Sequence, residues 1–357
     1  MVVSCVVAQY LARIGKVCSD DDGISAMCAK IDGIDPFAVG APWRVSPSVC
    51  RTGEGAKRMV SMLTILIVTY RSTDVLPACI ESLAKAKKAN TFVVHLLDNA
   101  STDDTVMVSQ QLQASYGAMF ADFSISQLAQ NRGFAYANNQ GLQSVTTPYV
   151  LLLNPDTIVA QDAIVRMLDH VEADVKVGMA TCRLTLADGR IDKACRRSLP
   201  TLANSFWRLT GLSLWFSRSR FFAGYNLTYL DEQGIYDVEC ISGAFMLFRT
   251  SLVREIGMLD EDFFMYGEDI DYCYRVKKAG YRILYDGTVT TVHLKGGNGG
   301  KKSAKSLQSF YATMLIYYDK HFAKDHPRLY RMALQVFLGM IYHIAKLRQL
   351  MKKESIS

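Results

Sequence analysis

The sequence predicts an α/β fold in which helices flank a mostly parallel sheet. Apolar, β-branched runs of strand length recur through the middle of the 357-residue chain and alternate with helical stretches. At 50% hydrophobic residues the chain can bury a sizeable core, and its length suits one large domain or two small ones. Polar motifs follow the apolar runs, at the edge where such sheets bind ligands.

The regular alternation begins at Leu63. Asp74 is expected to cap the first helix, which runs to about Lys88. The expected strands are 63–70, 92–98, 122–128, 148–156 and 243–249, and the later helices begin at 102 and 133. Residues 185–237, rich in arginine and aromatic residues, interrupt the alternation and are interpreted as an insertion.

Net charge is +6, and the segment 320–357 accounts for all of it, with eight Lys and Arg residues against Asp325 and Glu354. A balanced body with a basic end argues against a nucleic-acid-binding protein, whose basic residues usually cover the folded domain. A membrane surface is the expected partner of this tail.

Nine cysteines, an odd number without Cys-x-x-Cys spacing, indicate neither a zinc site nor a disulfide framework. A reducing cytoplasm is therefore expected. No apolar run reaches the roughly 18 residues of a spanning helix, and residues 1–11 lack the basic start of a signal peptide. We expect a protein that is not secreted.

Residues 1–58 lack periodicity and are expected to form a poorly ordered extension. Because Met59 and Met62 stand just before the first strand, a start codon assigned too far upstream is an alternative explanation. The expected division is then an extension over 1–58, a main domain over 59–322 that includes the insertion, and a helical tail over 323–357.

The first polar cluster follows two neighbouring strands, with Thr69 and Tyr70 after the first, and Asp98, Asn99 and Ser101 after the second. Such positions suit a nucleotide: the aspartate can accept a hydrogen bond from the imide N–H of uracil or thymine, and the serine can meet ribose or phosphate. The alternative is that Asp98 and Ser101 only cap the next helix.

The second cluster lies in QNRGFAYANN, residues 130–139. Gly133 permits a tight entry into a helix, and Arg132 can stack on a base or pair with a diphosphate. The alternative is a solvated surface arginine. No GxGxxG follows the first strand, which argues against a dinucleotide-binding dehydrogenase.

The third cluster is NPDT at 154–157, which ends a strongly apolar strand. Asp156 offers a hard oxygen ligand at the sheet edge, where a divalent cation could clamp a diphosphate. The alternative is a Pro-Asp turn in which Asp156 caps a helix.

The fourth cluster runs from Asp260 to His293. Asp271 is expected to pair with Arg275 one helical turn on. Asp269 follows the aromatic run FFMY, and the apolar surroundings are expected to raise its pKa towards base chemistry. His293 follows a β-like run and precedes a glycine-rich segment, and we expect it to bind metal rather than pack in the core.

Together these motifs resemble the family 2 glycosyltransferases of the GT-A fold, and more narrowly their bacterial rhamnosyltransferase-like and galactofuranosyltransferase-like branch. The resemblance covers Leu63 to Phe322. It is carried in order by ILIVTYRS, VHLLDNASTDDT, NRGFAYANNQG, LLLNPDT, and SGAFMLFR with GMLDEDFFMYGEDIDYCYR. It implies a Rossmann-like sheet flanked by helices, with residues 185–237 on the acceptor side.

Carried over by position, Asp98 resembles the base-recognising aspartate of that family, and Arg132 with Asn139 belongs to its second nucleotide-side motif. Asp156 ends the counterpart of the metal-binding DxD, in which Asn154 replaces the first aspartate. This departure puts weight on other ligands, and His293 is the natural supplement.

By the same resemblance Asp269 is the general base, and the reaction is a single displacement with inversion assisted by Mg²⁺ or Mn²⁺. A nucleophilic aspartate with net retention is the mechanistic rival. The implied donor is dTDP-L-rhamnose or another dTDP- or UDP-sugar, and the implied acceptor is a lipid-linked saccharide of bacterial surface polysaccharide. Lys320 and His321 also match the branch but receive no chemical role.

The tail supports a membrane partner independently. Apolar residues recur at near-helical spacing among basic ones, at positions Leu334, Phe337, Leu338, Ile341, Ile344 and Leu347. Such an amphipathic helix suits an anionic membrane interface, on the cytoplasmic face of the cell membrane. The alternative is packing of this helix against the main domain or against a second subunit in a homo-oligomer.

Two rival functions stay open. A non-catalytic sugar-nucleotide or glycan-binding protein of the same fold would bind a donor without transfer, and Asp156, Asp269 and His293 argue against it. A nucleotidyltransferase would need a glycine-rich, basic phosphate loop after the first strand, and TYRSTD is not one.

Overall fold

The computed structural model describes residues 62–295 and 304–354. The expected extension over 1–58 and the glycine-rich segment 296–300 lie outside the described residues, so the prediction made for the extension stays untested.

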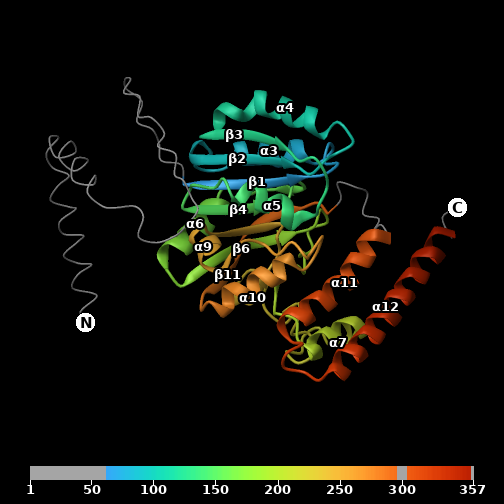
Figure 1. Cartoon of the computed structure of the whole chain (residues 1–357). Coiled ribbons are helices and arrows are strands. Elements are labelled where there is room, and N and C mark those ends of the chain that lie inside the picture. Colours follow the sequence, from blue (N-terminus) through green and yellow to red (C-terminus); the bar gives the residue numbers. More distant parts are fainter. Residues whose placement is uncertain (1–61, 296–303, 355–357) are drawn as a thin grey trace, which may run out of the picture. The chain divides into compact units, whose positions relative to one another are not determined.

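A nine-stranded sheet runs through the described residues, in the order β3-β2-β1-β4-β10-β6-β11-β5, and β8 pairs with β11 (Figure 1). Its strands are β1 Leu63–Thr69, β2 Phe92–Asp98, β3 Asp122–Gln127, β4 Tyr149–Leu153, β5 Thr157–Ile158, β6 Val177–Thr185, β8 Ile235–Val238, β10 Phe245–Arg249 and β11 Arg282–His293. A separate pair joins β7 Arg196–Arg197 to β9 Cys240–Ile241.

The first four strands are parallel, as the apolar runs of β1 and β4 predict. β10 then runs antiparallel between β4 and β6. The predicted α/β fold is confirmed, although the sheet is more mixed than the sequence suggested, because alternating strands and helices describe only its N-terminal half.

Helices flank this sheet and extend beyond it (Figure 1). They are α3 Leu76–Ala84, α4 Thr105–Tyr116, α5 Phe134–Leu142, α6 Ala163–Ala173, α7 Leu202–Thr210, α8 Leu212–Trp215, α9 Ser251–Ile256, α10 Glu268–Lys278, α11 Ala304–His321 and α12 Arg328–Glu354, with 3₁₀ turns at Ala89–Thr91 and Gly117–Met119.

The predicted cap of the first helix is wrong. α3 begins two residues after Asp74, with Val75 in the capping position and no side-chain cap, and it ends at Ala84 rather than near Lys88. Lys88 itself is left-handed, at φ 62°, where it enters a 3₁₀ turn. Pro77 explains the start, since proline is favoured in the first turn of a helix.

α11 is locked onto the main domain by polar contacts. His321 Nε2 lies 2.7 Å from Asp271 Oδ1, and Lys320 Nζ donates to Asp262 at 2.6 Å. Thr313 Oγ1 donates to the Tyr266 carbonyl at 2.9 Å. Lys320 and His321, which had no assigned role, thus fasten this helix.

Gly267 allows the closest approach of α11 to the start of α10. Its φ is +91°, and a Cβ there would lie 2.2 Å from Thr313 Cγ2. Glycine is therefore required here by backbone conformation and by space.

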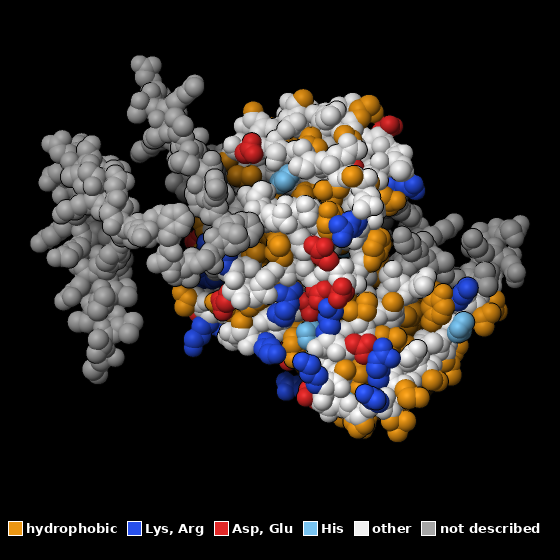
Figure 2. All heavy atoms as spheres, viewed as in Figure 1, with side chains coloured by type: hydrophobic (Ala, Val, Ile, Leu, Met, Phe, Trp, Pro, Cys, Tyr) orange, Lys and Arg blue, Asp and Glu red, His pale blue; other side chains and the backbone are white. Residues whose placement is uncertain are grey.

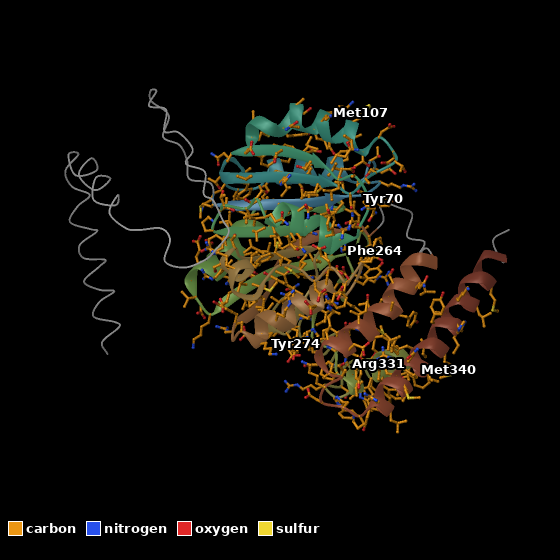
Figure 3. All side chains as sticks on the ribbon, in the orientation of Figure 1. Tyr70, Met107, Phe264, Tyr274, Arg331 and Met340 are labelled. Atoms are coloured by element: carbon orange, nitrogen blue, oxygen red, sulfur yellow. The ribbon has the colours of Figure 1, made fainter. Side chains whose placement is uncertain are left out.

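α12 carries apolar residues on two faces, which corrects the predicted membrane face. Leu338 is buried, and Leu334 and Phe337 are partly buried and turned inward. The exposed apolar stripe consists of Leu329, Met332, Val336, Met340, Ile344, Leu347 and Met351. Figure 2 shows hydrophobic side chains along this outer edge, and Figure 3 labels Met340 there.

No helix within the described ranges is both long enough and apolar enough to cross a membrane.

Candidate active site

The ends of β1 and β2 bring the first polar cluster together. Asp98 is buried and accepts hydrogen bonds from Thr69 Oγ1 at 3.1 Å and from the Ser101 N–H at 2.9 Å. Ser101 Oγ in turn accepts from the Arg71 N–H at 2.9 Å. Asp98 therefore shapes the loop after β2 and does not cap α4, which begins at Thr105 without a side-chain cap. This loop lies beside the exposed Tyr70 at the sheet edge (Figure 3).

The second cluster forms a loop that packs on residue 264. Gly133 has φ +101°, and a Cβ at this position would lie 2.3 Å from the Phe264 carbonyl oxygen, so only glycine fits. Asn99 Nδ2 donates to the Gly133 carbonyl at 3.2 Å and thereby joins this loop to the loop after β2. Arg132 is exposed, and its guanidinium lies 4.0 Å from the Tyr136 ring centroid.

Asn139 is buried, and the structure places it away from the pocket. Its amide donates to the Leu259 carbonyl at 2.8 Å and to Glu261 Oε1 at 2.9 Å, and its carbonyl accepts from the Leu259 N–H at 3.0 Å. These contacts anchor the segment that precedes α10, which is a positioning role rather than contact with a nucleotide.

Asp156 and His293 meet at the sheet edge because β5 and β11 pair there. His293 Nε2 lies 3.2 Å from Asp156 Oδ1 and 3.4 Å from Asn154 Nδ2. On the other side of the ring, Nδ1 lies 2.9 Å from Asp192 Oδ2. A carboxylate behind a histidine is the arrangement that orients metal-binding imidazoles.

His293 lies between two carboxylates, those of Asp156 and Asp192. Burial disfavours its protonation, but hydrogen bonds with Asp156 and Asp192 outweigh burial and raise the pKa of His293 to about 9. Burial also acts against the charge of Asp192, yet His293 and Lys295 hold the pKa of that carboxyl well below its usual range. Lys295 Nζ donates to Asp192 Oδ1 at 2.6 Å.

Asp269, in the first turn of α10, pairs with a buried arginine. Arg197 Nη2 donates to Asp269 Oδ2 at 2.6 Å and to the Ile241 carbonyl at 2.9 Å. Burial opposes the charge of the guanidinium, but the attraction of Asp269 prevails and raises the pKa of Arg197 further. The carboxylate stays partly accessible, with 13% of its side chain exposed.

Glu268, which precedes Asp269 in α10, is a carboxyl whose pKa is raised by burial. Burial, with the nearby charge of Asp269, raises the pKa of Glu268 to about 8. Its Oε2 atom has no hydrogen-bond partner among the described residues. The predicted pairing of Asp271 with Arg275 is confirmed, at 2.8 Å.

These groups share one pocket of about 1070 Å³. Of the predicted site residues, it is lined by Tyr70, Asn154, Asp156, Asp269 and His293. The pocket then extends between α7, α11 and α12. Thr69, Asp98, Asn99, Ser101, Arg132, Gly133 and Asn139 are not among its lining residues.

Four pocket residues were missed by sequence reasoning: Asp192, Arg197, Glu268 and Lys295. Asp192 and Arg197 lie in the irregular segment 185–237, whose fold the sequence does not reveal. Glu268 lies within the fourth cluster, but no role was expected for it from the sequence. The adjacent arginines at 196–197 were the one feature of the sequence that could have indicated this site, because a buried arginine needs an anionic partner.

The residues present fit a divalent cation in part. The described residues hold no cluster of three or more His, Cys, Asp and Glu side chains able to bind a metal. Asp156 and His293 supply one oxygen and one nitrogen donor facing the pocket, and Asp192 orients the imidazole. Two protein ligands suit a cation whose other ligands come from a substrate diphosphate.

The mixed sheet flanked by helices, with Asp156, His293 and Asp269 in one pocket, agrees with the GT-A glycosyltransferase fold that the sequence motifs resemble. The chain belongs to the family described as "Glycosyltransferase like family 2", whose model matches residues 61–309.

Two curated relatives are similar to this chain. The poly-beta-1,6-N-acetyl-D-glucosamine synthase of Staphylococcus aureus is 28% identical over 226 residues, covering 63% of this chain and 48% of the synthase. The rhamnosyltransferase WbbL of Escherichia coli K12 is 25% identical over 236 residues, covering 65% of this chain and 83% of that protein. The chain thus spans about half the length of the synthase that it matches.

Among solved structures, the mannosyltransferase PcManGT from Pyrobaculum calidifontis, in complex with GDP-Man and Mn²⁺, aligns with a TM-score of 0.52 at 16% identity. The alignment covers 82% of this chain and 72% of the mannosyltransferase. This likeness concerns the fold and agrees with the predicted GT-A architecture.

Proposed function

We propose that the protein is an inverting, metal-dependent glycosyltransferase that moves a sugar from a dTDP- or UDP-sugar to a lipid-linked glycan acceptor. One observation carries the proposal: Asp156, His293 and Asp269 line a single pocket. This reaction needs a pair of side chains that bind a cation beside the donor, and a carboxylate that accepts the proton of the acceptor hydroxyl.

In the proposed reaction Asp269 accepts the proton of an acceptor hydroxyl while that oxygen attacks the anomeric carbon of the donor. The bond from this carbon to the phosphate oxygen breaks, and the nucleoside diphosphate leaves with the electron pair. Arg197 fixes one carboxylate oxygen of Asp269 and so acts as a positioning residue.

Asp156 and His293 would hold the divalent cation, Mg²⁺ or Mn²⁺. When bound, the cation supplies Lewis-acid stabilisation of the diphosphate leaving group. Lys295, which also lines the pocket, adds a positive charge on the same side. The Mn²⁺ in the structural neighbour supports a divalent cation here.

The donor part of the proposal rests on Asp98 and on the relatives. Asp98 lies at the carboxyl end of β2, beside Tyr70 and the loop that carries Arg132, where a base and ribose would bind. Rhamnose is our preferred donor sugar, supported by the name of the Escherichia coli relative.

Peripheral attachment to the cytoplasmic face of the cell membrane completes the proposal. The outer stripe of α12 exposes apolar residues along its length, and Trp215 and Phe221 in the neighbouring insertion are 85% and 66% exposed. Exposed apolar patches of this extent need a cover, and basic residues such as Lys346 favour an anionic membrane surface.

The decisive experiment measures release of nucleoside diphosphate and sugar transfer from a panel of UDP-, dTDP- and GDP-sugars with Mg²⁺ or Mn²⁺. We expect release of UDP or dTDP that EDTA stops and that Asp269→Asn abolishes. Donor binding without turnover, even with extracted lipid-linked acceptors, would favour the non-catalytic binding protein instead. Retention of the anomeric configuration in the product would contradict the single displacement.

A further inference from the structure

The pocket has a second half that the proposed reaction does not use. Beyond Asp269 it continues between α7, α11 and α12. Apolar side chains line this half, which we call the hairpin groove: Leu202, Phe206, Leu209, Phe310, Met314, Leu334, Phe337 and Leu338. Phe206 and Phe337 are in contact in the wall of this groove, with ring centroids 5.9 Å apart.

The helix α7 has an apolar face that the described structure leaves uncovered. Thr201 and Asn204 form a reciprocal capping box at its start, so the helix is well defined. None of its residues is buried, although Leu202, Phe206 and Leu209 lie on one face at helical spacing. A formed amphipathic helix whose apolar face stays accessible needs an occupant on that face.

Arg208 places an unpaired positive charge in the groove. It lines the pocket and makes no ion pair or side-chain hydrogen bond within the described ranges. Its guanidinium lies 4.7 Å from the Tyr225 ring centroid and 5.8 Å from the Phe310 ring centroid. Stacked aromatics hold the guanidinium plane in place and leave its N–H donors available for an anion.

Two tyrosines add unsatisfied donors. Tyr317 and Tyr318 are 6% and 3% exposed, both line the pocket, and neither hydroxyl has a hydrogen-bond partner in the described structure. A buried hydroxyl without a partner is costly, so a ligand that accepts hydrogen bonds would stabilise both.

We propose that the hairpin groove binds the lipid phosphate of the acceptor, with the hydrocarbon chain along α7 and α12 and the phosphate oxygens on Arg208. This inference rests on the proposed function and specifies its acceptor: an alkyl or polyprenyl chain joined to the glycan through phosphate. Because groove and reaction site form one pocket, the anchored saccharide reaches Asp269. The groove also lies beside the outer stripe of α12, so the chain can enter from a membrane.

The test uses butyl, octyl and dodecyl phosphate as probes in calorimetric titrations of the full chain, below their micellar concentrations and without sugar nucleotide. We expect affinity to rise with chain length by up to about fourfold per buried methylene. Arg208→Gln should lower the affinity for dodecyl phosphate about tenfold or more, while Arg218→Gln, an exposed arginine outside the pocket, should not.

Dodecyl maltoside has the same hydrocarbon chain as dodecyl phosphate but no charge, so it tests the contribution of the chain alone. Arg208→Gln should leave its binding unchanged, and Phe337→Ala should weaken both dodecyl ligands. Equal affinities for all chain lengths, or equal effects of Arg208→Gln on charged and neutral ligands, would overturn the inference.

The inference and the proposed function fail separately. Sugar transfer by a protein that binds no alkyl phosphate overturns the inference alone. Alkyl phosphate binding by a protein that releases no UDP or dTDP contradicts the proposed function and still supports a lipid-phosphate site.

Discussion

The guanidinium of Arg197 lies 2.6 Å from the carboxylate of Asp269, and both side chains are largely removed from solvent. Removing one partner of such a pair leaves an uncompensated buried charge. We therefore expect Arg197→Gln to lower the free energy of unfolding by about 3–5 kcal/mol. Chemical denaturation measures this loss.

A matched control is Arg282→Gln, which breaks exposed ion pairs with Asp174 and Asp237. Exposed pairs contribute about 0–1 kcal/mol, so this variant should stay close to wild type. Equal losses for both arginines would show that Arg197 has no special structural role.

Asp269→Asn should reduce kcat for sugar transfer by about 10²–10⁴-fold, because the amide cannot accept the proton of the acceptor hydroxyl. Binding of the sugar nucleotide, followed by titration calorimetry, should change little. Asp188→Asn, an exposed carboxylate outside the pocket, serves as the control. Turnover of Asp269→Asn within threefold of wild type would exclude this residue as the base.

Glu268 makes stability depend on pH. Its folded pKa of about 8 lies above its usual value of 4.5, so the folded state binds this proton more tightly. The resulting stabilisation is complete below about pH 4.5 and is lost as pH rises through about 8, with a slope of at most about 1.4 kcal/mol per pH unit. Glu268→Gln should remove this slope in denaturation curves recorded from pH 5 to 9, and an unchanged slope would contradict the assignment.

Asp192 contacts Nδ1 of His293, the ring nitrogen on the side opposite Asp156. Asp192→Asn should therefore weaken Mn²⁺ binding about 10–100-fold, measured by calorimetry in the presence of UDP. Asp174→Asn, on the surface, is the matched control. Unchanged Mn²⁺ affinity in the Asp192 variant would mean that His293 does not bind the metal.

The outer stripe of α12 predicts binding to anionic vesicles. Val336→Glu replaces an apolar side chain that is 72% exposed and should reduce co-sedimentation with phosphatidylglycerol vesicles several-fold. Gln335→Glu adds the same charge at the neighbouring exposed position and should have a smaller effect. Deleting α12 is a poor test because Leu334, Phe337 and Leu338 line the pocket. Identical losses in both variants would point to charge alone.

The parallel half of the fold was predictable because the sequences of buried parallel strands are nearly continuous apolar runs, as in β1 and β4. That Asp156, Asp269 and His293 belong to the site was predictable, since each lies close to the start or end of a strand or helix. The partners of these residues were not. Asp192 lies outside the helices and strands, and Arg197 lies in the two-residue strand β7, so no periodicity in the sequence indicates where either side chain points.

The tail shows a second limit. Leu334 and Val336 are both apolar and lie on the same helix, yet one lines the pocket and the other faces outward. Helical spacing identifies a set of apolar residues but not what covers them, so the predicted membrane face combined inward residues such as Leu334 with the exposed Ile344 and Leu347.

The contact of Gly267 with Thr313 determines which segments must be exchanged together in a chimera with a related protein. Gly267, which immediately precedes the helix of Asp269, fits against α11 without room for one methyl group. A chimera that takes α11 and α12 from a relative must therefore take residues 260–271 with them. The boundary of an exchangeable block therefore lies before residue 260 rather than before α11.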